Sequence, residues 1–216
     1  MTTRNQQVAR IDYEADAEIE SSVETSVEQR IADLSGWAHA IVVSDYLKGV
    51  ISARVAAAAL AASRKHGIPL IVDPKVPHIA YYAGATVITP NHHEAESVTH
   101  MRIRTTADAR DAARRFRDRA RCAAVLITRG EHGMWLLGAG DPSVPGTEVE
   151  LAAEAREVAD VTGAGDTVVA ALALACAAGA PLADAARLAN RAAGIVVGKF
   201  GPATVTLEEM RGAAPR

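Results

Sequence analysis

Cysteine is scarce in this chain, which has only Cys122 and Cys176 among its 216 residues. Their separation shows no paired spacing, so we expect neither a disulfide framework nor a zinc site. Both are interpreted as small buried apolar side chains. A reducing cytoplasm is therefore the expected location.

Long apolar runs and a strong excess of either charge are also missing. The longest apolar run, residues 168–178, is too short to cross a bilayer, and the polar, acidic N-terminal stretch is unlike a signal peptide. A net charge of −3 argues against a nucleic acid or another polyanion as partner. We therefore expect small-molecule partners, with no nucleic acid and no membrane.

Aromatic residues make up only 4% of the chain, whereas 49% of its residues are hydrophobic. This composition predicts a core built from alanine, valine, leucine and isoleucine. The length suits one domain, with room for a small appendage.

From residue 38 onward, short apolar runs alternate with helical segments. The runs that predict buried strands are residues 40–43, 70–72, 86–88 and 124–127, and shorter strands are expected at 135–137 and 148–151. The predicted helices are residues 52–66, 105–121, 164–178 and 182–197, the second beginning with a capping box formed by Thr105 and Asp108. Residues 14–30 fit either a loop or an exposed helix. Apolar strands that alternate with helices predict a parallel sheet covered on both faces.

Each of the four main apolar runs ends in polar residues. These ends are Ser44-Asp45, Asp73-Pro74-Lys75, Thr89-Pro90-Asn91 and Thr128-Arg129-Gly130. Ligands of open α/β sheets bind at the carboxyl ends of the strands. We therefore expect the four ends to converge on one crevice.

Residues 160–167 read Asp-Val-Thr-Gly-Ala-Gly-Asp-Thr and precede an apolar run. Glycines allow a tight turn, and a helix beginning there would offer unpaired N–H groups to an anion such as phosphate. A carboxylate at Asp166 would stay ionised and could accept a proton from an alcohol. This pattern indicates phosphoryl transfer to a hydroxyl; the alternatives are a plain tight turn and an Asp166 that only caps the helix.

The same eight residues match the C-terminal signature of the ribokinase-like (PfkB) carbohydrate kinases. Within that family, the chain resembles the D-glycero-β-D-manno-heptose-7-phosphate kinases of ADP-heptose synthesis through residues 43–49, 72–75, 89–94, 126–130 and 196–201. The resemblance implies a ribokinase-like three-layer α/β/α fold with a mostly parallel sheet. It also implies ATP and Mg²⁺ as cofactors and a sugar phosphate as substrate.

The resemblance assigns the central roles to two segments. Asp166 would take the proton of the anomeric hydroxyl, and the backbone N–H groups of Gly163, Ala164 and Gly165 would hold the transferring phosphoryl group. Asn91 and Glu94 match the family's Asn-x-x-Glu motif, which serves the ATP phosphates and the magnesium shell. Glu94 would reach Mg²⁺ indirectly, through water. The residues alone favour a different role for this pair, a helix start with Asn91 as its cap and Glu94 in its first turn.

The remaining assignments are more peripheral. Nucleotide contacts are implied for Thr128, Arg129 and Gly130, with a simple strand exit as the alternative. Lys75 would face either phosphate or solvent, and Asn190 and Lys199 would wall the adenine pocket. Asp45 and Lys48 would border the sugar or phosphate site or merely form a turn at a strand end. Arg10 and Asp12 resemble the strand that leaves the lid of the family.

One departure from the family concerns the N-terminal side. Family members carry a glycine-rich sugar-binding signature, the first sheet strands and most of the lid before the segment of Asp45, and this chain has no Gly-Gly dipeptide. We therefore expect an N-terminally truncated fold: residues 1–30 as a polar segment resembling the exit from the lid, and residues 31–216 as the C-terminal part of the kinase domain. Another sugar or nucleoside kinase and an inactive or split nucleotide-binding fragment stay open. So do a homodimer and a partner chain that supplies the missing half.

Overall fold

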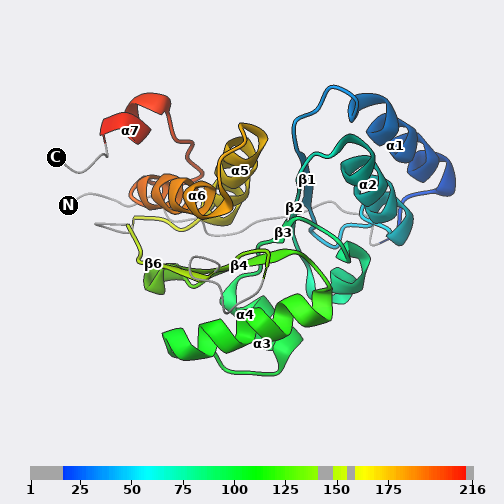
Figure 1. Cartoon of the computed structure of the whole chain (residues 1–216). Coiled ribbons are helices and arrows are strands. Elements are labelled where there is room, and N and C mark those ends of the chain that lie inside the picture. Colours follow the sequence, from blue (N-terminus) through cyan, green and yellow to red (C-terminus); the bar gives the residue numbers. More distant parts are fainter. Residues whose placement is uncertain (1–16, 141–147, 155–158, 213–216) are drawn as a thin grey trace.

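The computed structural model describes residues 17–140, 148–154 and 159–212, so Arg10 and Asp12 lie outside the described residues. It contains one six-stranded sheet in the order β1-β2-β3-β4-β5-β6 (Figure 1). The strands are β1 (Ile41–Ser44), β2 (Leu70–Asp73), β3 (Val87–Ile88), β4 (Ala124–Thr128), β5 (Met134–Leu137) and β6 (Glu148–Leu151). The first four are parallel, and β5 and β6 continue antiparallel. The prediction of a mostly parallel sheet is confirmed.

Helices cover both faces of this sheet. The first face packs against α2 (Ala53–His66), the short η1 (Val76–Tyr82), α3 (His92–Thr99) and α4 (Thr106–Ala120). The second packs against α5 (Ala164–Ala177) and α6 (Leu182–Val196), and α7 (Leu207–Gly212) contacts α6. Neighbouring residues of β2 show the division, because Val72 belongs to the first core and Ile71 to the second. The predicted three-layer α/β/α architecture is therefore confirmed.

Local signals in the sequence explain where the helices begin. Thr105 and Asp108 form the expected capping box at α4, with reciprocal bonds between side chain and backbone. Ser52 caps α2 by accepting a hydrogen bond from the Val55 amide, and Gly67 ends that helix in the left-handed conformation. These caps satisfy backbone groups that a helix cannot pair internally.

Cys122 and Cys176 are both free in the structure. Cys122 is buried in the first core, and burial raises the pKa of its thiol to about 12, so it stays protonated at neutral pH. Cys176 is half-buried against the second core. Both pack as small apolar side chains, as expected.

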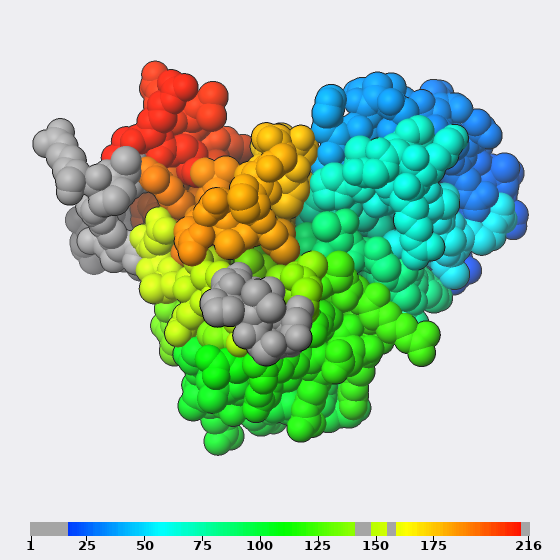
Figure 2. All heavy atoms as spheres, in the orientation of Figure 1, coloured from blue at the N-terminus to red at the C-terminus, as the bar shows by residue number. Residues whose placement is uncertain are grey.

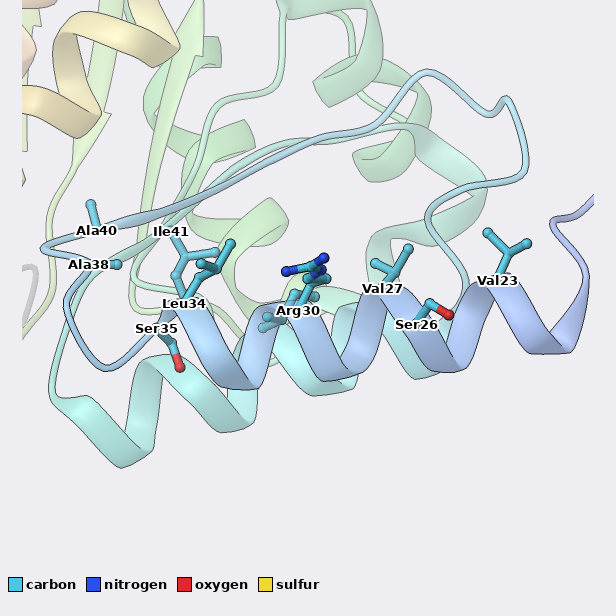
Figure 3. Close-up of a pocket in the computed structure, with 10 residues that line it drawn as sticks. Val23, Ser26, Val27, Arg30, Leu34, Ser35, Ala38, Ala40 and Ile41 are labelled. Atoms are coloured by element: carbon cyan, nitrogen blue, oxygen red, sulfur yellow. The ribbon is translucent and has the colours of Figure 1, made fainter.

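Strand β1 lies at an edge of the sheet, beside α1 (Ser21–Leu34). In the space-filling view, the α1–α2 region (blue and cyan) and the C-terminal helices (orange and red) form two lobes above the green body (Figure 2). A largely apolar groove of about 390 Å³ runs between α1 and β1, and Val23, Val27 and Leu34 project from α1 beside it (Figure 3). No residue of α1 is buried, and Glu24 and Glu28 attach it to Arg54 of α2 by ion pairs. Of the two alternatives for residues 14–30, the exposed helix is thus the one seen from Ser21 onward.

The exposed edge of β1 leads to a prediction about association. No described strand pairs with its outer side, and Val42, within this strand, is 45% exposed. We expect the isolated chain to self-associate or to bind a dye for apolar surfaces, because an unpaired strand edge is a template for pairing. Val42→Lys should shift the protein toward monomer, as measured by size-exclusion chromatography with light scattering. Val50→Lys is the control, since Val50 is equally exposed but lies outside the strand. A monodisperse wild-type monomer that binds no dye would contradict the prediction.

Among the described residues, no helix combines the length and apolar character needed to cross a bilayer.

Candidate active site

Polar residues from three of the four predicted strand ends, those of β2, β3 and β4, meet the start of α5 in one crevice; Ser44 and Asp45, at the end of β1, are not among its lining residues. Its volume is about 160 Å³, and it is lined by Asp73, Lys75, Thr89, Asn91, Glu94, Thr128, Gly163, Gly165, Asp166 and Val168. Seven of the residues that the sequence predicts for the site, Asp166 and six others, therefore line this crevice. Asp73 and Thr89 join them, two strand-end residues to which sequence reasoning gave no individual role.

The glycine-rich turn adopts the conformation that its sequence favours. Gly163 precedes α5 with φ of 78°, in the left-handed region that favours glycine. A Cβ atom built on Gly163 or Gly165 would meet nothing within 4 Å, so their backbone faces open space. The amide of Ala164 is different, because it donates to the Val161 carbonyl at 3.2 Å. A ligand anion would thus find room at the two glycines rather than at Ala164.

Asp160 fixes the glycine-rich turn through hydrogen bonds to the backbone and side chain of Thr162. Its Oδ1 accepts hydrogen bonds from the Thr162 amide and hydroxyl at 2.9 and 2.7 Å, and its Oδ2 accepts from the Gly201 amide at 3.2 Å. The bonds from Thr162 are the main cause that lowers the pKa of Asp160, so the carboxylate stays charged. Asp160 thereby ties the turn to the segment after α6.

Asp166 lies in the first turn of α5 with an exposed side chain. The N-cap of α5 is Gly163, and the Oδ1 atom of Asp166 instead accepts a hydrogen bond from the Tyr46 hydroxyl at 2.8 Å. The alternative that Asp166 serves only as helix cap is therefore not what the structure shows. Its carboxylate faces the crevice, next to the positive end of the helix dipole.

Asn91 and Glu94 form a capping box at the start of α3. The Asn91 side chain accepts from the Glu94 amide, and Glu94 Oε2 accepts from the Asn91 amide, each at 2.9 Å. The helix-start interpretation is thus correct as local structure. Both residues also line the crevice, so the cap fixes where the Glu94 carboxylate stands.

Lys75 reaches into the crevice and pairs with Glu94, with Nζ 2.7 Å from Oε1. Partial burial acts to lower the pKa of Lys75, but the hydrogen bond and charge of Glu94 outweigh it, and the pKa is raised. Lys75 is therefore a fixed cation of the crevice.

Thr128 lines the crevice, whereas Arg129 and Gly130 are not among the lining residues. The Arg129 side chain is 8% exposed, and it donates to the His132 carbonyl at 2.8 Å and to Glu150 of β6 at 3.2 Å. Gly130 begins the short η2 (Gly130–His132). Arg129 thus joins the β4–β5 turn to β6, and its guanidinium is directed away from the crevice.

The other expected site residues lie outside the crevice lining. Asn190 is buried in α6 and donates to the Ala152 carbonyl at 2.7 Å, and Lys199 pairs with Glu209 of α7 at 2.6 Å. Asp45 is only 1% exposed and bonds to Tyr82 and His78, while Lys48 is exposed on the same loop. For Asp45, the geometry matches the strand-end turn rather than a direct contact with a sugar.

Asp73 is the residue of the crevice whose pKa is most displaced. Burial is the main cause that raises it to about 6; the charge of Lys75 acts against this rise, and the nearby Glu94, Asp166 and Asp45 add to it. A folded-state pKa above the ordinary value means that this carboxyl stabilises the fold below about pH 4. The contribution is lost as the pH rises through about 6.

We therefore expect Asp73→Asn to stabilise the nucleotide-free protein at pH 7, by about 1–2 kcal/mol after allowance for solvent screening. The gain should shrink as the pH falls and be nearly gone near pH 4, where the carboxyl is protonated in the folded state and about half protonated in the unfolded state. Urea unfolding of wild type and variant between pH 4 and 7 checks this. Asp111→Asn, at an exposed position of α4, is the control. A gain that does not change with pH would contradict the prediction.

The layered sheet, with a glycine-rich helix start and an acidic side chain at its strand ends, defines a ribokinase-like α/β domain. The sequence profile described as "pfkB family carbohydrate kinase" matches residues 3–210, and the chain belongs to this family of kinases.

Curated relatives with the name "Bifunctional protein HldE" match nearly the whole chain. The protein of Geotalea uraniireducens is 46% identical over 206 residues, which cover 95% of this chain and 41% of that protein. The protein of Coxiella burnetii is 42% identical over 208 residues, with 96% and 42% covered. The chain thus spans about two-fifths of the length of these relatives.

Solved structures support the fold. Phosphofructokinase-2 from Escherichia coli superposes with a TM-score of 0.76 at 18% identity, covering 91% of this chain and 62% of that one. Ribokinase of Arabidopsis thaliana, solved with ribose and ATP, gives a TM-score of 0.68 at 21% identity, with 91% and 59% covered. At such identities the likeness establishes the fold alone.

Proposed function

We propose that the crevice receives the phosphates of ATP and supports transfer of the γ-phosphoryl group to a sugar phosphate. The proposed acceptor is D-glycero-β-D-manno-heptose 7-phosphate, and the product is its 1,7-bisphosphate. The observation that carries the proposal is the exposed carboxylate of Asp166 at the glycine-lined start of α5, facing the same crevice as Lys75 and Glu94. The choice of sugar, and with it a place in ADP-heptose synthesis, is supported by the relatives named HldE.

The residues of the crevice fit the phosphates of a nucleotide with a magnesium ion. Open space above Gly163 and Gly165 leaves room for phosphate oxygens, as the start of a helix favours. Both carboxylate oxygens of Glu94 are already engaged, by Lys75 and by the Asn91 amide. Among the described residues, no three His, Cys, Asp or Glu side chains form a ready set of direct ligands. Contact with Mg²⁺ through water therefore suits Glu94 better than direct coordination.

Chemistry in this crevice would depend on orientation and charge. Asp166 takes the proton of the acceptor hydroxyl, whose oxygen bonds to the γ-phosphorus while the bond to the β–γ bridging oxygen breaks and ADP leaves. The helix start at Gly163 and Gly165 and the Lys75 ammonium stabilise the negative charge on the phosphoryl oxygens. Magnesium, when bound, offsets further phosphate charge.

The experiment is a set of parallel incubations with ATP and Mg²⁺, each with one acceptor. The acceptors are heptose 7-phosphate, fructose 6-phosphate, ribose and a nucleoside, and mass spectrometry identifies the product. We expect the heptose 1,7-bisphosphate alone. Preferential phosphorylation of another acceptor would reject the heptose assignment in favour of another sugar or nucleoside kinase. Nucleotide binding without any product would favour a nucleotide-binding fragment or one half of a split enzyme.

A further inference from the structure

A hydrogen bond connects the segment after β1 with the start of α5. The Tyr46 hydroxyl donates to Asp166 Oδ1 at 2.8 Å, across 120 positions of sequence. The side chain comes from the loop of residues 45–49, and the residue is 55% exposed. The transfer reaction described above leaves this contact without a role.

The first end of that loop is fixed by a buried carboxylate. Asp45 Oδ2 accepts a hydrogen bond from the Tyr82 hydroxyl at 2.6 Å and lies 2.7 Å from His78 Nδ1. Its Oδ1 accepts from the Leu47 amide at 2.9 Å, one residue beyond Tyr46. Burial, and then the bond to Asp45, raise the pKa of Tyr82, so its hydroxyl remains a donor. Because leaving a buried carboxylate without these partners would be costly, Asp45 fixes the start of the loop that carries Tyr46.

The second end is fixed by backbone packing. Gly49 has φ of 82°, and a Cβ atom built on it would stand 2.1 Å from the Ala17 carbonyl oxygen. Its own carbonyl accepts from the Ile19 amide at 3.2 Å. Only glycine fits such an approach without displacement, so residues 45–49 are anchored on both sides of Tyr46.

We propose that Tyr46 is a positioning residue for Asp166. Its phenol holds Oδ1 and thereby leaves Oδ2 oriented toward the hydroxyl of the acceptor. Asp45, Tyr82 and His78 act through Tyr46, by fixing the loop that carries it. The inference rests on the proposed function, in which Asp166 is the base.

The raised pKa of Tyr46 agrees with a hydroxyl that donates a hydrogen bond to Asp166. The hydrogen bond to Asp166 is the main cause that raises the pKa of Tyr46; partial burial and the charges of Asp166 and Asp73 add to it, and a bond with Ser44 opposes it. The phenol therefore keeps its proton at neutral pH.

Tyr46→Phe removes the hydroxyl and keeps the ring. We expect kcat to fall about 10- to 100-fold, since a misplaced catalytic group costs rates of this order. KM for ATP should stay the same, because the change does not touch the residues assigned to the phosphates. Tyr81→Phe is the matched control, a tyrosine that stacks on His78. An unchanged or raised kcat in Tyr46→Phe would overturn the proposal, because Tyr46 would then be a resting contact that the acceptor displaces.

A second measurement needs no turnover. With 3-fluorotyrosine incorporated, ¹⁹F NMR follows the titration of each of the four tyrosines, and Tyr46→Phe assigns the signal. In Asp166→Asn, the pKa of Tyr46 should fall, because the charged acceptor is gone. An unchanged titration would show that the two side chains are not in contact and would overturn the proposal.

The two hypotheses fail separately. Retained turnover in Asp166→Asn rejects the base, and with it the positioning role, even where the Tyr46 titration confirms the contact. An inactive Asp166→Asn beside a fully active Tyr46→Phe rejects the positioning role alone.

Discussion

Asp166→Asn is expected to abolish phosphoryl transfer while ATP still binds. The variant keeps the size and the helix position of the side chain, but an amide cannot take the proton of the acceptor hydroxyl. General base catalysis commonly contributes a factor of about 10²–10⁴, so the rate should fall at least that far. Nucleotide affinity should change little, since the contacts proposed for the phosphates come from Gly163, Gly165, Lys75 and the α3 start.

The measurement combines mass spectrometry of the product with calorimetric titration of ATP. Asp184→Asn is a matched control, because Asp184 is the third residue of α6 as Asp166 is the third residue of α5. Both variants lose a negative charge near a helix start, which costs typically about 0.3–1 kcal/mol. Only Asp166→Asn should lose activity. Turnover near the wild-type rate would remove Asp166 as the base.

Glu94→Gln is expected to weaken magnesium-dependent binding of ATP, by about 10- to 100-fold if Glu94 acts on the metal through its outer shell. The helix should survive, because glutamine also completes a capping box. What is lost is the negative charge beside Lys75, at 2.7 Å in the wild type. The effect should therefore appear in nucleotide affinity and not in folding.

Titrations of ATP at several Mg²⁺ concentrations measure this effect, with thermal unfolding as the check on stability. Glu96→Gln is the control on the same helix, since Glu96 bonds to the Ile103 amide and pairs with Arg102 instead of lining the crevice. An unchanged magnesium requirement in Glu94→Gln would count against the assigned role.

Much of the fold follows from local pattern. The continuous apolar runs predict the parallel strands, and caps such as Thr105 with Asp108 place helix starts to within a residue. The convergence of the polar ends of β2, β3 and β4 also follows, because parallel strands end at the same edge of a sheet. The residue types alone predict the helix start at Asn91, and the structure confirms it.

Other features depend on tertiary contacts that no local pattern encodes. Thr128 and Arg129 are adjacent at a strand end, yet only Thr128 lines the crevice. Arg129 instead donates a hydrogen bond to Glu150 of β6, which is 21 positions away in the sequence. The sequence likewise does not predict the hydrogen-bond partners of Asp45, which lie 33 and 37 positions away. Nor does it predict the hydrogen bond from Tyr46 to Asp166.

We propose above that the phosphates of ATP bind in the crevice between the strand ends and the start of α5. This claim can be tested by NMR of the ¹⁵N-labelled chain with a non-hydrolysable ATP analogue and Mn²⁺, because the paramagnetic ion broadens nearby amide signals. We expect the strongest broadening at Gly163, Gly165 and Glu94. A second hollow, of about 750 Å³, includes Gly67 and Gly84 among its lining residues. Strongest broadening there, with the crevice signals unchanged, would contradict the claim.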